Sequence, residues 1–233
     1  MTELRPLLPA WADELFLAGH QMGRWIVDYV ELEESLAVGS IGQEQLGHAR
    51  ELLAVCGLDV TARDARFFDR PATEWNPSGL VVVRAGDDWA ELVAASYVLA
   101  AATLALLDGA AGADPALAVI RPEQALHLEH WRRWLSLLRA DAATAPLLEA
   151  ALARTAACGD DLLAAVPGTT ADLEAVRGAF AERLAHDGIA APERFFARAT
   201  REAGRHAAAI APVVADLRAV RDRYATVALE VEP

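Results

Sequence analysis

Apolar residues recur every three to four positions along most of the chain, which is the spacing of one face of an α-helix. Alanine, leucine, arginine and glutamate, all strong helix formers, are abundant throughout. The pattern predicts helices over about residues 9–29, 31–55, 87–108 and 115–140, with almost no loop between the first two. Pro122 lies inside the fourth predicted helix and should kink it or split it into two pieces.

A long connection separates the second predicted helix from the third. Residues 57–88 contain prolines, glycines and an asparagine that cannot sustain a helix, and the stretch "GLVVV" within them suggests a short extended piece. Beyond the fourth helix the pattern predicts a fifth over about 145–166 and a shorter one over about 173–186. A final long helix is expected over about 188–224, bent or broken near Pro212.

Two tightly connected helix pairs joined by a long crossover are typical of a ferritin-like four-helix bundle. The predicted fold class is therefore all-α, a ferritin-like bundle with additional C-terminal helices. We expect residues 1–233 to form a single domain, with the core bundle over about 9–140 and the appended helices over about 145–226. A hydrophobic fraction of 54% in 233 residues is enough for one sizeable core.

The charge balance narrows the classes of function. The net charge is −13 and no basic stripe is visible, so binding of nucleic acid or of an anionic membrane surface is not expected. No apolar run approaches the roughly 18 uncharged residues that a membrane span needs, and the acidic start does not suit a signal peptide. The two cysteines, Cys56 and Cys158, show no metal-type spacing, and we expect a cytoplasmic protein.

Two similar pentapeptides carry the candidate chemistry. "EQLGH" ends at His48 in the second predicted helix, and "EQALH" ends at His127 in the fourth. Ferritin-like di-iron proteins place Glu-x-x-His on two helices, because residues three apart share a helix face, and one further Glu on each of the other two. Here the residues three before the histidines are Gln45 and Gln124. Two negative charges are thereby missing from the expected metal pocket.

The other two expected carboxylates are missing as well. The third predicted helix has no carboxylate between Glu91 and Asp108, and the first presents His20 and Gln21 at the level where a glutamate is expected. The sequence therefore predicts no catalytic set and no di-iron ligand set in this chain, only degenerate ligand positions. It contains no recognisable cofactor-binding motif.

Two interpretations remain for the pentapeptides. Glu44 and Glu123 precede the histidines by four positions, so they share a helix face with them and could be substitute ligands in a salvaged metal site that includes His20. The preferred interpretation is that Glu44 and Glu123 make surface or interfacial contacts with the histidines. His20, His48 and His127 would then belong to a hydrogen-bonded polar core with Gln45 and Gln124 as partners, because buried polar groups normally find such partners.

Several segments, in their order and spacing, resemble one protein family. The segments are "LFLAGHQMGRW", "ELEESLAVGSIGQEQLGHARELL", "DPALAVI" followed by "HLEHWRRWLSLL", and "GRHAAAIAPVVADLRAV". Together they resemble the structural C subunit of bacterial phenylacetyl-CoA epoxidase, in the ferritin-like phenylacetic acid catabolic protein family. The last segment keeps His206 but has Ala208 and Ala209 where that family has Glu and His.

The resemblance implies a definite role. In that enzyme a paralogous A subunit with the same bundle carries the di-iron centre, and the C subunit has lost the ligands and serves as its scaffold. A small B subunit and a reductase with a flavin and an iron–sulfur cluster complete the system. The resemblance therefore implies no cofactor in this chain, an A-like catalytic partner, and epoxidation of phenylacetyl-CoA by the complex in aerobic phenylacetate degradation.

Three other functions are compatible with the sequence. An autonomous metalloenzyme would use Glu44 with His48 and Glu123 with His127. A divergent scaffold would serve an oxygenase for a related CoA thioester. An acidic helical bundle could also mediate assembly outside phenylacetate metabolism.

Overall fold

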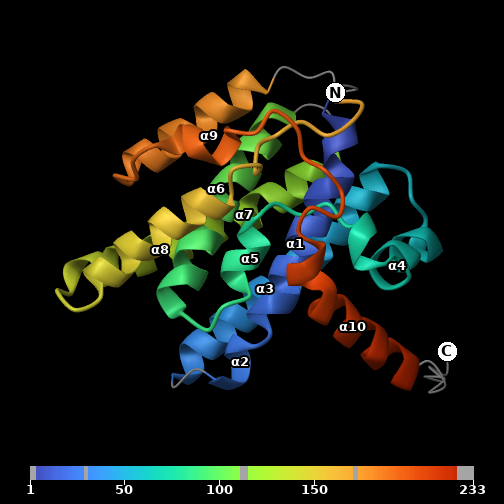
Figure 1. Cartoon of the computed structure of the whole chain (residues 1–233), viewed down its shortest axis with the longest axis horizontal. Coiled ribbons are helices and arrows are strands. Elements are labelled where there is room, and N and C mark those ends of the chain that lie inside the picture. Colours follow the sequence, from blue (N-terminus) through green and yellow to red (C-terminus); the bar gives the residue numbers. More distant parts are fainter. Residues whose placement is uncertain (1–3, 29–30, 111–114, 170–172, 225–233) are drawn as a thin grey trace.

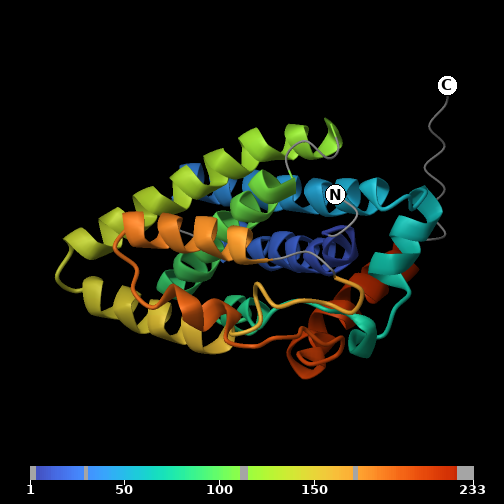
Figure 2. The same cartoon turned by 90° about the horizontal axis from the view of Figure 1, so that it is seen from above.

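The computed structural model describes residues 4–28, 31–110, 115–169 and 173–224. Four long helices form the bundle: α1 (Leu8–Met22), α3 (Leu32–Val55), α6 (Trp89–Ala110) and α7 (Pro115–Ala140). They lie in two pairs, α1 with α3 and α6 with α7, and α3 lies beside α7 where the pairs meet (Figure 1, Figure 2). The all-α, ferritin-like bundle predicted from the sequence is confirmed.

Two glycines bring the backbones of α1 and α3 close together. A Cβ on Gly19 would lie 2.5 Å from the backbone oxygen of Gly42, and a Cβ on Gly42 would lie 3.1 Å from the oxygen of Gly19. Because only glycine lacks a Cβ, only glycine permits this approach. Both glycines belong to segments that carry the family resemblance, so close helix packing explains part of that resemblance.

Helix α6 lies at the centre of the core. It packs against α7 and against three further helices, α5 (Leu80–Arg84), α8 (Ala145–Cys158) and α9 (Glu174–His186). Every side chain from residue 92 to residue 107 is buried. By length and hydropathy the segment Trp89–Gly109 would suffice to cross a membrane, which corrects the expectation that no apolar run approaches that size. However, 94% of its apolar window is buried inside the protein, so the surrounding helices account for its composition.

The first helix is shorter than the predicted range of 9–29. Helix α1 ends at Met22 with Gly23 as its C-cap, and a one-turn helix, α2 (Trp25–Asp28), follows. Residue 29 lies outside the described residues. The early end follows from Gly23, because glycine is a poor residue for a helix interior.

The crossover between the helix pairs is partly helical, which corrects the expectation of an irregular segment. Helix α4 (Val60–Phe68) begins after Asp59, whose side chain accepts a hydrogen bond from the Ala62 N–H at 2.8 Å. This is an ordinary N-cap, which the sequence "DVTA" signals. The Phe67 ring stacks on Phe16 at 4.0 Å and holds α4 against α1. A short 3-10 turn, η2 (Ala72–Glu74), follows.

The stretch "GLVVV" is helical and not extended. It forms α5 (Leu80–Arg84), in which Leu80, Val81 and Val83 are fully buried. β-Branched residues favour strands only where a neighbouring strand can pair with them. Since no strand is available among the described residues, a helical turn is the way to satisfy the buried backbone groups locally.

The appended region is less helical than predicted. Helix α8 (Ala145–Cys158) ends before Gly159 and not near 166, and α9 (Glu174–His186) matches its predicted range. The last helix, α10 (Ala207–Tyr224), begins well after the predicted residue 188. A 3-10 turn, η3 (Pro192–Phe196), lies in the preceding segment. An α-helix cannot form across that segment because three of its residues have positive φ: Gly188, Ala191 and Gly204.

Two prolines lie inside helices without ending them, Pro122 in α7 and Pro212 in α10. Pro122 is exposed, and so is Ala118, whose carbonyl loses its hydrogen-bond donor. Water can serve that carbonyl, so the helix continues. The predicted split of the fourth helix therefore does not occur.

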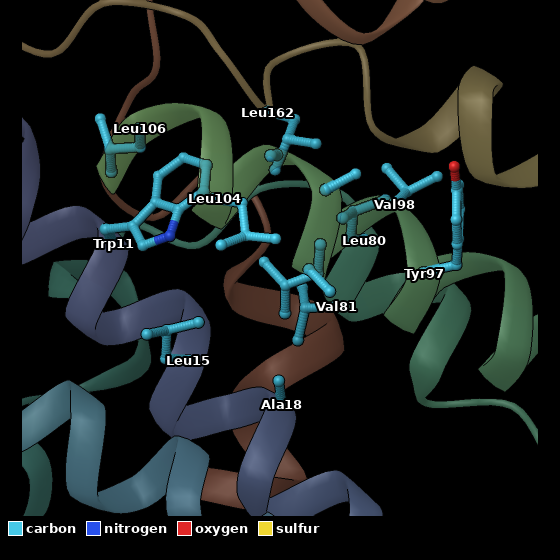
Figure 3. Close-up of a cluster of buried hydrophobic side chains, with 14 of the residues drawn as sticks. Trp11, Leu15, Ala18, Leu80, Val81, Tyr97, Val98, Leu104, Leu106 and Leu162 are labelled. Atoms are coloured by element: carbon cyan, nitrogen blue, oxygen red, sulfur yellow. The ribbon is translucent and has the colours of Figure 1, made fainter. Parts of the chain in front are cut away.

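The core joins the first helix pair to the second. In Figure 3 the side chains of Trp11, Leu80, Leu104 and Leu162 converge from α1, α5, α6 and the segment after α8. Each of them is at most 4% exposed. Trp11 Nε1 donates to Thr103 Oγ1 at 3.1 Å, so the polar atom of the ring is satisfied inside the core.

Candidate functional site

The residues of the two pentapeptides meet between α3 and α7. The helices run antiparallel there, as Figure 2 shows. Gln45 and His48 of α3 and Gln124 and His127 of α7 are each at most 4% exposed. These four side chains form one buried group, which we call the Gln–His cluster.

Hydrogen bonds join the two glutamines to each other and to both histidines. Gln124 Nε2 donates to Gln45 Oε1 at 2.9 Å and to His48 Nδ1 at 2.8 Å. Gln45 Nε2 lies 3.4 Å from His127 Nδ1. The amides are thus the partners of the histidines, as the polar-core interpretation requires.

The second nitrogen of each histidine ring faces a glutamate of the opposite helix. His48 Nε2 lies 2.5 Å from Glu123 Oε2, and His127 Nε2 lies 2.5 Å from Glu44 Oε2. Each glutamate therefore pairs with the histidine across the helix interface, not with the histidine four positions along its own helix. The side chains of Glu44 and Glu123 are 43% and 46% exposed, so the cluster reaches solvent through them.

The amide nitrogens of Gln45 and Gln124 face Nδ1 of the two rings. An amide N–H can only donate, so each Nδ1 accepts and each Nε2 carries the proton that it donates to a glutamate. A ring that accepts at Nδ1 and donates at Nε2 is in its neutral form. Burial lowers the pKa of His127 below its ordinary value of 6.5, and the hydrogen bond to Glu44 offsets only part of that shift.

One polar atom of the Gln–His cluster, Gln124 Oε1, is buried without a partner among the described residues. Reversing the amide would place this oxygen against Gln45 Oε1, so that two acceptors would face each other. The observed orientation therefore satisfies more of the cluster, at a cost of about 1–3 kcal/mol for the orphaned oxygen.

This donor set does not fit a di-iron centre. Such a centre needs carboxylates that neutralise and bridge two cations. The cluster offers neutral amides at both ligand positions, and α6 supplies Ser96, Tyr97 and Thr103 between its terminal acids. In the part of the chain that the structure describes, no group of three or more His, Cys, Asp or Glu side chains is arranged to hold a metal ion.

His20 does not belong to the Gln–His cluster, which corrects the expectation that it shares a site with the other two histidines. Its charged neighbour is Asp216 of α10. Burial lowers the pKa of His20, and Asp216 opposes this shift. The adjacent Gln21 turns to α5, where its Nε2 donates to the Val81 carbonyl at 3.0 Å and its Oε1 accepts from Arg84 at 3.2 Å.

Sequence reasoning missed a buried ionic network on α1. Glu14 is fully buried and accepts hydrogen bonds from Arg84 at 2.7 Å and Arg201 at 2.6 Å, with both guanidinium groups buried as well. The backbone N–H of Ser78 donates to the same carboxylate at 2.5 Å. Burial alone would raise the pKa of Glu14, but the two arginines outweigh it and lower that pKa.

Asp161 is the second buried acid of this network. It accepts from the Gly79 N–H at 2.9 Å and from Arg205 at 2.7 Å, and its Oδ2 lies 3.0 Å from His206 Nε2. Burial opposes ionisation, but the hydrogen bond to His206 and the charge of Arg201 prevail, so the pKa of Asp161 falls to about 2. His206, which the family resemblance singled out, therefore anchors a structural carboxylate.

A third acid, Asp13, is paired in the same way with Arg66 and Arg70. The signal that could have revealed the network is the pair Asp13-Glu14 inside an apolar helix. Acids at such positions are buried only when charged partners reach them. These partners come from the crossover and from the segment before α10, so the network ties both to α1.

The bundle and the paired pentapeptides define a ferritin-like helical protein whose ligand positions are occupied by a hydrogen-bonded polar cluster. The phenylacetic acid catabolic protein family matches residues 2–228, and the chain belongs to this family. The family assignment made from the sequence segments is thereby confirmed. A search of curated proteins found no match to the chain.

Proposed function

We propose that the chain is a non-catalytic structural subunit of a multicomponent di-iron monooxygenase that epoxidises phenylacetyl-CoA in aerobic phenylacetate degradation. Its partner is the catalytic A-like paralogue, which carries the di-iron centre. A small B subunit and a reductase with a flavin and an iron–sulfur cluster complete this cytoplasmic complex. Membership of the phenylacetic acid catabolic protein family supports the metabolic context.

The observation that carries the proposal is the hydrogen bond between Gln45 and Gln124 at 2.9 Å. These are the two positions that hold the glutamates of Glu-x-x-His in a ferritin-like di-iron protein. Here they bond to each other and to the rings of His48 and His127. Metal binding would require breaking these bonds without supplying the missing negative charge, whereas the same bonds suit a bundle that only has to stay rigid.

The rest of the molecule also suits a scaffold. The buried pairs of Glu14 with Arg84 and Arg201 join α1 to residues far away in the sequence. Such pairs are demanding in geometry and favour one arrangement of the segments that they join. The contribution of the chain to catalysis is then indirect: it holds the catalytic bundle in the shape that the reaction needs.

Iron content tests this function. The chain is expressed alone and together with the A-like paralogue, loaded with ferrous iron without oxygen, desalted and analysed for metal. We expect almost no iron on the lone chain and about two irons per pair, the number in a di-iron protein. The matched control is the pair that carries His48→Ala and His127→Ala, which should keep its iron content.

The opposite result would assign the metal to this chain. About two irons on the lone chain, lost when His48 and His127 are replaced, would make it an autonomous metalloenzyme and overturn the proposal. Epoxidation of phenylacetyl-CoA should need both subunits and the reductase. Equal turnover by the A-like subunit alone would also reject a structural role.

A further inference from the structure

One face of α7 presents apolar side chains to solvent at coiled-coil spacing. Val119 is 69% exposed, Leu126 is 70% exposed and Leu137 is 60% exposed, and the exposed Pro122 and Arg133 lie between them. The intervals of three, four, seven and four residues keep all five on one stripe of the helix. Leu137 and Arg133 also border an open depression of about 480 Å³. An isolated exposed leucine needs no explanation, but a stripe of this length does.

Helix α3, which lies beside α7, also presents exposed apolar side chains. Leu32 and Leu36 are 68% and 60% exposed. Figure 2 shows α3 and α7 side by side along one edge of the molecule, with no other described helix outside them. We call the exposed sides of these two helices the α3–α7 face.

Gly47 lies on the α3–α7 face, in the interior of α3. Glycine there costs about 1 kcal/mol relative to alanine. A Cβ at Gly47 would meet nothing within 4 Å, so packing inside this chain does not require glycine. Gly42, in the same helix, differs because it packs against α1. The absence of a side chain at Gly47 leaves room for the close approach of a helix from outside the chain.

The charges on the α3–α7 face indicate what kind of helix fits. Glu33, Glu44 and Glu51 are exposed along α3, and Glu123 adds a half-exposed carboxylate from α7. A complementary helix needs apolar residues at heptad spacing and arginine or lysine on the side that faces α3. A second copy of this chain, with a net charge of −13 and the same acidic row, matches this less well.

We infer that the α3–α7 face is the docking surface for a helix of the metal-bearing paralogue. The identity of this partner rests on the proposed function. The docked helix covers Leu126 and Gly47 and places basic side chains beside Glu44 and Glu123. These glutamates are the solvent-facing ends of the Gln–His cluster, so docking removes water from the crossed Glu–His pairs and makes them stronger.

The test measures the dissociation constant of the purified chain with the purified A-like paralogue by analytical ultracentrifugation. Leu126→Glu and Gly47→Arg alter the α3–α7 face. The matched controls are Leu147→Glu on α8, where the leucine is 54% exposed, and Gly178→Arg on α9, where a Cβ also meets nothing within 4 Å. Each variant at Gly47 or Leu126 should weaken binding at least about tenfold, as a central interface residue does, and the controls should change it little.

Folding is not an obstacle to this comparison. Arginine is a strong helix former, so Gly47→Arg and Gly178→Arg should both raise the thermal midpoint of the lone chain. Only Gly47→Arg should also disrupt the complex. A more stable chain that no longer binds cannot be explained by unfolding.

The outcomes separate the two proposals. If the unaltered chain does not bind the paralogue, the proposed function is wrong. If it binds and the Leu126 and Gly47 variants bind equally well, the function stands and the assignment of the α3–α7 face is wrong. If these variants instead abolish a homodimer, the face belongs to a second copy of the chain, which also overturns the inference.

Discussion

Glu44 of α3 and His127 of α7 meet at 2.5 Å, although Glu44 lies only four positions before a histidine of its own helix. The reciprocal pair of Glu123 with His48 has the same distance. The two pairs therefore act as cross-links between helices. They matter because the backbones of α3 and α7 pack less extensively than those of α1 and α3.

The crossing of the pairs can be measured by a double-mutant cycle. Glu44→Ala and His127→Ala, separately and combined, should show a coupling of about 1 kcal/mol in urea unfolding, because one hydrogen bond to a half-exposed carboxylate is lost. The matched control is the cycle of Glu44→Ala with His48→Ala, which should show almost no coupling. A larger coupling within α3 than across the interface would contradict the crossed arrangement.

The neutral state of His127 predicts a pH dependence of stability. Its folded pKa lies below the ordinary value of 6.5, so the unfolded chain takes up a proton more readily than the folded chain. The free energy of unfolding should therefore fall as the pH drops through about 6.5 and level off below the folded pKa. Urea midpoints between about pH 8 and pH 5 would measure this.

A neutral replacement isolates the contribution of His127. Since glutamine cannot titrate, His127→Gln should reduce the slope of stability against pH. His20, whose pKa is also lowered by burial, contributes a slope of the same sign, so His20→Asn should remove a separate part. An unchanged slope in His127→Gln would mean that this ring is not held neutral.

The four bundle helices could be predicted because helical periodicity is local information. The same holds for Gln45 and Gln124, whose positions relative to the histidines follow from helix geometry alone. The crossed glutamate pairs could not be predicted, because both Glu44–His48 and Glu44–His127 contacts are compatible with the spacing. The register of α3 against α7 decides between them, and that register depends on the whole core.

Other features of the structure could not be predicted either, because they also depend on contacts with residues that are distant in the chain. "GLVVV" has the composition of a strand, but burial of Leu80 and Val81 in a bundle without a paired strand makes it helical. The burial of Glu14 could not be predicted, because its partners Arg84 and Arg201 lie 70 and 187 residues away. Local propensity contains no information about such partners.

Removal of Glu14 should be one of the most damaging single substitutions in the chain. Glu14→Leu leaves the buried charges of Arg84 and Arg201 uncompensated, which costs about 3–5 kcal/mol. The control is Asp87→Asn, which removes the partner of Arg24 in a pair whose side chains are 86% and 52% exposed and should change stability by less than about 0.5 kcal/mol. Urea unfolding measures both variants. Similar losses in the two would mean that the Glu14 network is not an important source of stability.

Asp161 predicts a second, more acidic transition. Its pKa falls from 3.8 in the unfolded chain to about 2 in the folded protein, so its contribution is complete above about pH 4 and is lost as the pH falls toward 2. The shift corresponds to about 2 kcal/mol. Asp161→Asn should be less stable at neutral pH and should lose this part of the acid dependence. Acid titrations followed by circular dichroism would show an unchanged curve if Asp161 were not held ionised.

Two glycines should respond to alanine in opposite ways. A Cβ on Gly79 would lie 1.8 Å from the backbone oxygen of Cys158, so Gly79→Ala must push α5 away from α8 and stretch the bond from the Gly79 N–H to Asp161. Overpacking against backbone cannot be relieved by a rotamer change, and we expect the free energy of unfolding to fall by about 3 kcal/mol or more.

Gly47→Ala meets no atom within 4 Å and should stabilise the lone chain by about 1 kcal/mol, because alanine is the better helix former. Thermal and urea unfolding of the two variants measure both effects in one experiment. Equal effects would show that α5 and α8 are not in backbone contact at Gly79.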